Sequence, residues 1–339
     1  MERAEVVVIG GGVIGTSIAF HLAEAGVDVQ LLERGELGSG STSKGAGGIR
    51  AMFSDELNVR IGLRDLDAWR AFAERPGWEI DFDEVGYLFL LSRPEDVHRF
   101  EQDVAMQNSL GLPSRMLTPA GAHELSPLAG GDGVLAAAFC PQAGLATPEA
   151  AVQGYAAGAR RHGARIRSGC ALTAIEVEGG SVRRVVSGAG VIETPTVICA
   201  AGVWSAEVGA MAGVELPVTP ERRRIAYTGP LEDLPERIPM TIDFETGFYF
   251  HREGPGLLFG TSDVCETQDE WLERAVPVLE RRAPILLEVP IAGGWSGLYE
   301  MTPDHNALIG EAPSPSRFLY ATGFSGHGFQ QAPAVGEIV

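Results

Sequence analysis

The sequence predicts an α/β fold of two domains. The chain has 339 residues, which is more than a single domain of about 150 residues usually holds. The β-branched run 5–9 is typical of a parallel strand covered on both faces, and a glycine-rich turn and an amphipathic helix follow it directly. Between residues 217 and 295 the pattern changes to short strands separated by Pro and Gly turns.

Composition excludes several classes of function. Lys and Arg number 26 against 45 Asp and Glu, which gives a formal charge of −19. An acidic surface repels phosphate backbones and anionic lipid headgroups, so we expect no nucleic acid or membrane partner. No apolar run reaches the ~18 residues of a membrane span. The four cysteines form no CxxC, which indicates neither a disulfide framework nor a metal site and favours a reducing, cytoplasmic location.

The first strand, turn and helix have the spacing of a dinucleotide-binding motif. Residues 10–15 read GxGxxG. Gly10 permits the tight turn, Gly12 lets the backbone approach a pyrophosphate, and Gly15 lets the helix pack close to the strand. A second strand leads to Glu33, which lies near the spacing of an acid that binds a ribose. The alternative is a glycine-rich turn in a purely structural βαβ unit.

The loop that follows favours FAD over NAD. Residues 38–50 read GSGSTSKGAGGIR, where an NAD domain normally continues into another βαβ repeat. Backbone amides and hydroxyls of such a loop can donate hydrogen bonds to a pyrophosphate, and small side chains leave room for a ring system. A flexible linker is the alternative.

The remaining pattern predicts further elements in chain order. They are a helix at 54–73 with Ser54 as N-cap, a strand at 84–91, a helix at 148–163, strands near 164–177 and 182–194, and a strand at 318–322 before a glycine-rich turn and a final helix. The run Arg222-Arg223-Arg224 is interpreted as a solvated face.

Three further motifs carry a resemblance to a known family. They are TVICAAGVWS at 196–205, GLYEMTPDH at 297–305 and GFSGHGFQ at 323–330. With the N-terminal motif they resemble the FAD-dependent amine and amino-acid oxidoreductases of the D-amino-acid oxidase superfamily. The most similar branch holds sarcosine oxidase β subunits, dimethylglycine dehydrogenase and the FAD subunit of L-proline dehydrogenases.

The resemblance implies a Rossmann-like FAD-binding domain of the glutathione-reductase type, interleaved with a substrate domain on a mixed, largely antiparallel sheet. Residues 1–74, 146–213 and 296–339 would form the FAD domain, and 75–145 and 214–295 the substrate domain. Together with the motifs, it implies FAD contacts from Gly10, Gly12, Val13, Ile14, Gly15, Glu33, Arg34, Ser41, Thr42, Ser43, Gly47, Gly48, Ile49, Leu172, Ala200, Ala201, Gly202, Trp204, Gly326, His327, Gly328, Phe329 and Gln330.

The resemblance also suggests catalytic residues. Arg50 stands where related enzymes clamp a carboxylate, and Tyr249 and His251 share the face of a strand that resembles one lining the pocket. Gln330 replaces a second carboxylate-binding Lys, which puts a strict α-amino-acid substrate in doubt. Gly297 replaces the Cys that bonds FAD in the monomeric sarcosine oxidases, so we expect noncovalent FAD. Leu258 stands near the position of an oxygen-activating Lys.

The expected activity is oxidation of the C–N bond of a secondary or tertiary amino acid by hydride transfer to flavin N5, followed by hydrolysis of the imine. Electrons would pass to O₂ or to a partner protein or dye, and a hetero-oligomer is possible. Two alternatives remain open: a catalytically idle flavoprotein that serves as an assembly factor or complex subunit, and an NAD-dependent dehydrogenase.

Overall fold

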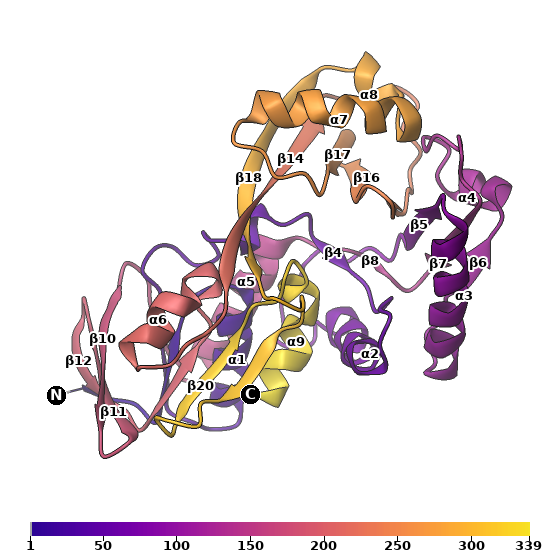
Figure 1. Ribbon diagram of the computed structural model, residues 1–339. Helices are drawn as coiled ribbons and strands as arrows, with labels where there is room; N and C mark the ends of the chain where they lie inside the picture. Colours follow the sequence, from indigo (N-terminus) through magenta and orange to yellow (C-terminus); the bar gives the residue numbers. More distant parts are fainter. Residues whose placement is uncertain (1) are drawn as a thin grey trace.

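The computed structural model describes residues 2–339 and contains two large sheets (Figure 1). The first has the strand order β19-β20-β13-β2-β3-β9. Its edge strand β19 is antiparallel and the other pairs are parallel. The strands are β2 (Val6–Ile9), β3 (Val29–Leu32), β9 (Arg165–Arg167), β13 (Thr196–Cys199), β19 (Leu308–Glu311) and β20 (Phe318–Thr322).

Both faces of this sheet are covered. Val6 and Val8 pack into one hydrophobic core with α1 (Val13–Glu24), α5 (Pro148–Arg161) and α9 (Gly328–Ile338). Val7 and Ile9 point to the opposite core, which a small sheet of order β1-β12-β11-β10 shares. The alternation explains the continuous β-branched run, because each residue is buried on one face or the other. The small sheet comprises β1 (Glu2–Arg3), β10 (Leu172–Glu178), β11 (Ser181–Ser187) and β12 (Gly190–Glu193).

The second large sheet has eight strands in the order β18-β14-β17-β16-β15-β5-β7-β6. Only the pair β15 and β5 is parallel among the pairs within residues 2–339 of this sheet. Its strands are β5 (Tyr87–Leu91), β6 (Arg115–Leu117), β7 (Ala136–Cys140), β14 (Thr219–Thr228), β15 (Met240–Asp243), β16 (Phe248–Glu253), β17 (Gly256–Gly260) and β18 (Ile291–Met301). The mixed, largely antiparallel sheet confirms the predicted fold class.

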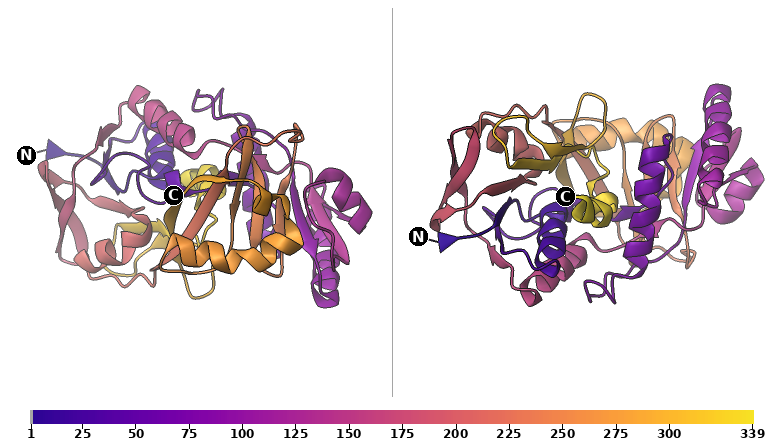
Figure 2. Two further views of the ribbon diagram at one scale, coloured as in Figure 1. Left: turned by 90° about the horizontal axis from the view of Figure 1, so that it is seen from above. Right: turned by 90° about the horizontal axis from the view of Figure 1, so that it is seen from below.

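The remaining elements connect and cover these sheets. Figures 1 and 2 show α3 and α4 at the end of the molecule opposite the small sheet. The helices are η1 (Thr42–Lys44), α2 (Glu56–Arg70), α3 (Pro94–Ser109), α4 (Pro119–Leu125), η2 (Gly202–Trp204), α6 (Ser205–Met211), α7 (Gln268–Arg282) and α8 (Ile285–Glu288), and β4 (Gly48–Ile49) pairs with β8 (Gly144–Leu145). Within residues 2–339 no helix combines the length and the apolarity needed to cross a membrane.

The chain crosses between the large sheets several times. The first sheet takes strands from 6–32, 165–199 and 308–322, and the second from 87–140 and 219–301. The domain boundaries given above stay a prediction. One local prediction is wrong: the helix predicted at 54–73 is the shorter α2, and its N-cap is Asp55, whose carboxylate accepts a hydrogen bond of 2.9 Å from the amide of Asn58.

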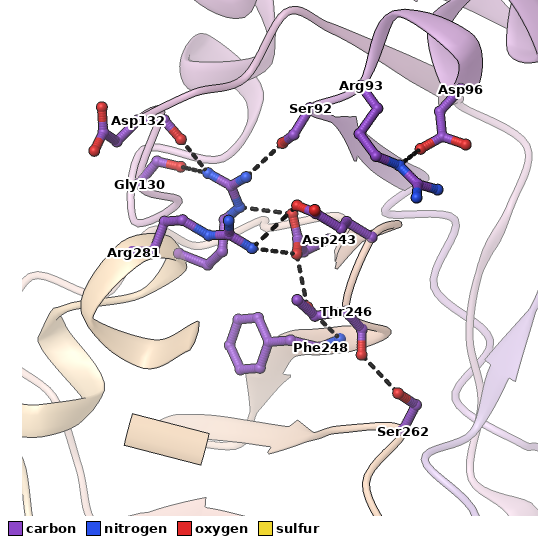
Figure 3. A network of polar contacts seen from close by, with 12 residues as sticks. Ser92, Arg93, Asp96, Gly130, Asp132, Asp243, Thr246, Phe248, Ser262 and Arg281 are labelled. Atoms are coloured by element: carbon purple, nitrogen blue, oxygen red, sulfur yellow. Dashed lines mark hydrogen bonds and ion pairs between the residues drawn. The ribbon is translucent and has the colours of Figure 1, made fainter. Parts of the chain in front are cut away.

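A buried ion pair fixes α7 to the second sheet (Figure 3). Arg282, which is 1% exposed, donates from Nε to Asp243 Oδ1 at 2.6 Å. Its two Nη atoms donate to the carbonyl of Asp132 at 2.6 Å and to Ser92 Oγ at 2.5 Å. Thr246 Oγ1 donates to Asp243 Oδ2 at 2.6 Å. The network therefore satisfies a charge pair that would be costly if either partner were missing.

Candidate active site

A cavity of about 530 Å³ lies between the two large sheets. Its wall includes the carboxyl ends of β2, β3 and β13, where open α/β sheets bind their ligands. On the other side the wall consists of residues from five strands of the eight-stranded sheet, β5, β14, β15, β16 and β18. A volume of this size falls within the ~300–1,000 Å³ of small-molecule sites.

The glycine-rich turn forms one end of the cavity. Gly10 has φ +112°, and a Cβ there would overlap the carbonyl oxygen of Ala200. A Cβ on Gly15 would overlap the carbonyl oxygen of Gly10, so Gly15 serves the close packing of α1 and does not line the cavity. Residues 12–14 do line it. The first turn of α1 has no acidic side chain, which leaves the positive end of the helix dipole available to an anion.

Glu33 closes the same end. Its Oε2 accepts a hydrogen bond of 2.6 Å from the amide of Gly11, and its Oε1 accepts one of 2.7 Å from the amide of Gly35. The next residue, Arg34, stacks its guanidinium 3.8 Å from the ring centroid of Trp204. Leu172 and residues 200–202 also line this end. This end of the cavity therefore has a carboxylate from Glu33, an aromatic ring from Trp204 and backbone groups from residues 200–202. Such groups suit a nucleotide.

The loop 41–48 lies along the middle of the cavity. Ser41 Oγ donates to the carbonyl of Leu298 at 2.6 Å, and Thr42 Oγ1 accepts a hydrogen bond of 3.2 Å from the amide of Val13. Gly47 has φ +72°, and a Cβ there would overlap the carbonyl oxygen of Ala146. These contacts hold the loop against both α1 and β18.

The N-terminus of α9 forms the other end. His327 is its N-cap, and its first turn has no acidic residue. Gln330 Oε1 accepts a hydrogen bond of 3.3 Å from the amide of Arg50. Gln330 Nε2 is buried and has no hydrogen-bond partner within residues 2–339, although Gln330 lines the cavity. A donor group is thus available there for a bound molecule.

Arg50 places a cation in the wall without an anionic partner. Its Nη1 donates to the carbonyl of Met52, its Nη2 lies 3.2 Å from His327 Nε2, and its guanidinium carbon is 4.6 Å from the ring centroid of Phe53. Burial lowers the pKa of Arg50, and no carboxylate in the described part of the chain acts on it. Burial and the charge of Arg50 lower the pKa of His327 to about 3. The histidine is therefore neutral and can accept a proton of Arg50 in a hydrogen bond.

Three tyrosines of the second sheet line the same cavity as this cation. Each ring or hydroxyl is accommodated by a glycine: Tyr87 beside Gly48, Tyr249 over Gly260 and Tyr299 against Gly326. None of the three hydroxyls has a hydrogen-bond partner within residues 2–339, and burial raises all three pKa values. Met240, Ile242 and Ile225 complete this apolar side.

His251 lies outside this cavity. It shares a strand face with Tyr249, as predicted, but residues 44–46 divide that face into two parts. His251 lines a second cavity of about 670 Å³. Its Nδ1 lies 2.7 Å from the carbonyl of Arg252, its Nε2 is buried without a partner in residues 2–339, and burial lowers its pKa to about 4.

Most of the predicted site residues thus come together. Ser43 lies outside the first cavity and lines the second, and Ile49 is fully buried in the core. Sequence reasoning did not identify Tyr87, Tyr299 or Arg223 as wall residues. The motif at 297–305 could have identified Tyr299, because Tyr299 lies two residues from Gly297. Tyr87 and Arg223 carry no local signal. The cavity-lining residues that were predicted are Gly10, Gly12, Val13, Ile14, Glu33, Arg34, Ser41, Thr42, Gly47, Gly48, Arg50, Leu172, Ala200, Ala201, Gly202, Trp204, Tyr249, Gly326, His327, Gly328, Phe329 and Gln330.

Comparisons with known proteins extend over the whole chain. The family model described as FAD dependent oxidoreductase matches residues 5–339. The chain is 29% identical over 366 residues to mitochondrial dimethylglycine dehydrogenase of Mus musculus, covering 100% of this chain and 42% of that protein. It is also 29% identical to mitochondrial sarcosine dehydrogenase of Mus musculus, covering 99% of this chain and 39% of that protein. The chain therefore spans less than half the length of these two relatives.

A solved structure gives a fuller match. The crystal structure of L-proline dehydrogenase from P. horikoshii superposes with a TM-score of 0.94 at 34% identity, over 100% of this chain and 92% of that one. The match covers both large sheets and the cavity between them.

Proposed function

Because this chain belongs to the family of FAD-dependent oxidoreductases, we propose that it oxidises the C–N bond of a secondary or tertiary amino acid. Sarcosine, proline and N-methyl amino acids are the substrate types, and the imine product hydrolyses in water. The names of the relatives support this class. The observation that carries the proposal is Arg50, a half-buried cation that lines the cavity and has no carboxylate partner within residues 2–339.

The residues of the cavity fit FAD. The nucleotide end offers Glu33 and the N-terminus of α1, and the other end offers the unpartnered Nε2 of Gln330 and the N-terminus of α9. Gly297 has no side chain that could bond to the cofactor, which supports noncovalent binding. When bound, FAD would supply the oxidant, a flavin that can take up a hydride from the carbon next to the amine nitrogen. The N-terminus of α1 would favour the pyrophosphate, and the N-terminus of α9 would favour negative charge on the flavin.

Arg50 binds the substrate carboxylate. Its contacts with Met52 and His327 fix the guanidinium plane, and the remaining N–H groups are free to bind a planar carboxylate in two places. An uncompensated buried cation is costly, so an anionic ligand relieves the cost. Neutral His327 accepts from Arg50 and adds no second charge.

The tyrosine side positions the amine and excludes water. Tyr87, Tyr249 and Tyr299 offer phenol oxygens that can accept a hydrogen bond from the N–H of a secondary amine, whereas a neutral tertiary amine has no N–H and packs against the rings. Within residues 2–339, the acidic residues of the cavity wall are Glu33, Glu207 and Glu300, and none of them forms a hydrogen bond with these tyrosines that would hold the amine as a cation. The neutral amine is the reactive form, because its lone pair assists departure of the hydride.

Electrons leave the site to O₂ or to a partner protein, and a hetero-oligomer would provide such a partner. Leu258, near the expected position of an oxygen-activating Lys, is 2% exposed and lines the second cavity. A purely apolar side chain there offers no charge for oxygen activation. Mixing the reduced holoprotein with air-saturated buffer measures this directly, and slow reoxidation beside fast transfer to a dye would favour the partner protein.

Anaerobic titration of the FAD holoprotein tests the activity. Sarcosine, L-proline and N,N-dimethylglycine should bleach the oxidised flavin, whereas glycerol 3-phosphate should not, because it offers no amine. If glycerol 3-phosphate alone bleaches the flavin, the proposed substrate class is wrong. If no secondary or tertiary amino acid bleaches a flavin that dithionite reduces, the idle flavoprotein replaces it.

A further inference from the structure

We propose that Arg223 is a second anion-binding residue of the same cavity, and that the preferred substrates are secondary amines with an acidic group on each arm, such as N-carboxyalkyl amino acids. The inference rests on the proposed function, because it takes Arg50 to hold the first carboxylate. Arg223 would then determine which substituent the nitrogen carries.

The three consecutive arginines of β14 have different surroundings. Arg222 is exposed and donates to Ser296 Oγ at 3.0 Å. Arg224 donates to backbone carbonyls at 265 and 266, close to the start of α7. Arg223 alone of the three lines the cavity, together with Ile225 two residues further on. The interpretation of the whole run as a solvated face is therefore wrong for Arg223, because alternate residues of a strand point to opposite faces.

Arg223 keeps donors available for a ligand. Its Nη1 donates to the carbonyl of Ser262, and its Nη2 contacts Glu221. A guanidinium has five N–H donors, so Nε and one hydrogen on each Nη have no assigned partner within residues 2–339. Glu221 pairs with Arg223 from the same strand face and lies opposite Tyr299 on β18, but it does not line the cavity. The carboxylate thus orients the guanidinium, while the guanidinium forms the wall.

Tyr299 connects the two arginines. The guanidinium carbon of Arg223 lies 5.5 Å from the ring centroid of Tyr299. Burial raises the pKa of that phenol on balance, while the charges of Arg223 and Arg50 act to lower it and the charge of Glu221 acts to raise it. The cavity therefore has Arg223 beside Tyr299, one of the tyrosines against which we place the amine, in addition to Arg50.

The acidic residues of the wall lie elsewhere. Glu33 and Glu207 belong to the nucleotide end, and Glu300 accepts hydrogen bonds from Thr322 Oγ1 at 2.9 Å and the amide of Gly323 at 3.0 Å. No acidic side chain of the described wall stands between Arg50 and Arg223. A methyl arm would leave Arg223 without a ligand, whereas a carboxyalkyl arm would form a second charge-assisted contact.

Three thioethers test this with a binding readout. Thiodiacetate and its longer homologue 3-(carboxymethylthio)propanoate carry two carboxylates, and methylthioacetate carries one. Sulfur replaces the amine, so the FAD holoprotein binds them without oxidising them as amines, and the change in flavin absorbance gives Kd. The variants are Arg223→Gln, the charge-retaining Arg223→Lys, and Arg222→Gln as a matched control on the same strand.

We expect the wild type to bind the better dicarboxylate about tenfold or more tightly than methylthioacetate, as one charge-assisted contact provides. Arg223→Gln should bring the two Kd values within about twofold while binding of methylthioacetate is retained, Arg223→Lys should keep part of the preference, and Arg222→Gln all of it. If the wild type binds the dicarboxylates and methylthioacetate with equal Kd values, or if the preference survives Arg223→Gln, the role of Arg223 is wrong. Either outcome leaves the proposed function standing. Failure of all three thioethers to bind wild-type holoprotein overturns the proposed function as well.

Discussion

Replacing Arg50 by alanine tests the carboxylate site. The side chain contacts Met52 and His327 through one hydrogen on each Nη atom, which leaves two or more donors for a substrate. Hydrogen bonds to a charged group are worth about 1.5 kcal/mol each at the low end. Loss of two therefore costs about 3 kcal/mol, or roughly a 100-fold drop in the rate of flavin reduction at limiting substrate.

The assay is anaerobic stopped-flow reduction of the FAD holoprotein by L-proline or sarcosine. Arg60→Ala is a suitable control, because Arg60 is exposed and pairs with Glu56 at 2.6 Å on the surface of α2. FAD content is measured first, and Arg50→Lys should recover part of the affinity if charge is what matters. If Arg50→Ala is reduced as fast as the wild type at limiting substrate, Arg50 does not bind the carboxylate.

Three other changes probe the cofactor site and stability. Gly10→Ala should abolish FAD binding to apoprotein, since its φ of +112° and its contact with the neighbouring carbonyl admit no Cβ, whereas Gly26→Ala, with φ +86° and open space, should bind FAD normally. Asp243→Ala leaves Arg282 buried without its partner and should cost about 3–5 kcal/mol in urea unfolding; a loss below about 1 kcal/mol would contradict the network. Asp65, 1% exposed, has a pKa raised well above its usual value by burial. The unfolded chain releases this proton near pH 4, while the folded carboxyl holds it to higher pH, so the wild type loses stability as pH rises. Asp65→Asn should lose less between pH 4 and pH 8, and an identical pH profile would refute the assignment.

The nucleotide end of the site could be predicted from sequence because its residues are close together in the chain. The strand β2, the turn at 10–15 and Glu33 form one βαβ unit, whose conformation depends on local rules for glycine and helix termini. The positions of these residues in the cavity follow from that unit.

The substrate end could not be predicted in the same way. Tyr87 and Tyr299 are more than 200 residues apart in the sequence, and four strands separate β5 from β18 in the second sheet, yet both residues line the cavity. His251 shows a further limit: its strand face was predicted correctly, but the loop at 44–46 that separates it from Tyr249 comes from a distant segment. Local periodicity indicates which face a residue occupies and not what covers that face.

The most direct test of the account is anaerobic single-turnover reduction of the FAD holoprotein by secondary and tertiary amino acids, with the product analysed. The account predicts that at least one of L-proline, sarcosine and N,N-dimethylglycine reduces one flavin per chain and yields one imine or its hydrolysis products. A flavin that stays oxidised with all three, and with N-carboxyalkyl amino acids, while dithionite reduces it, would contradict the account.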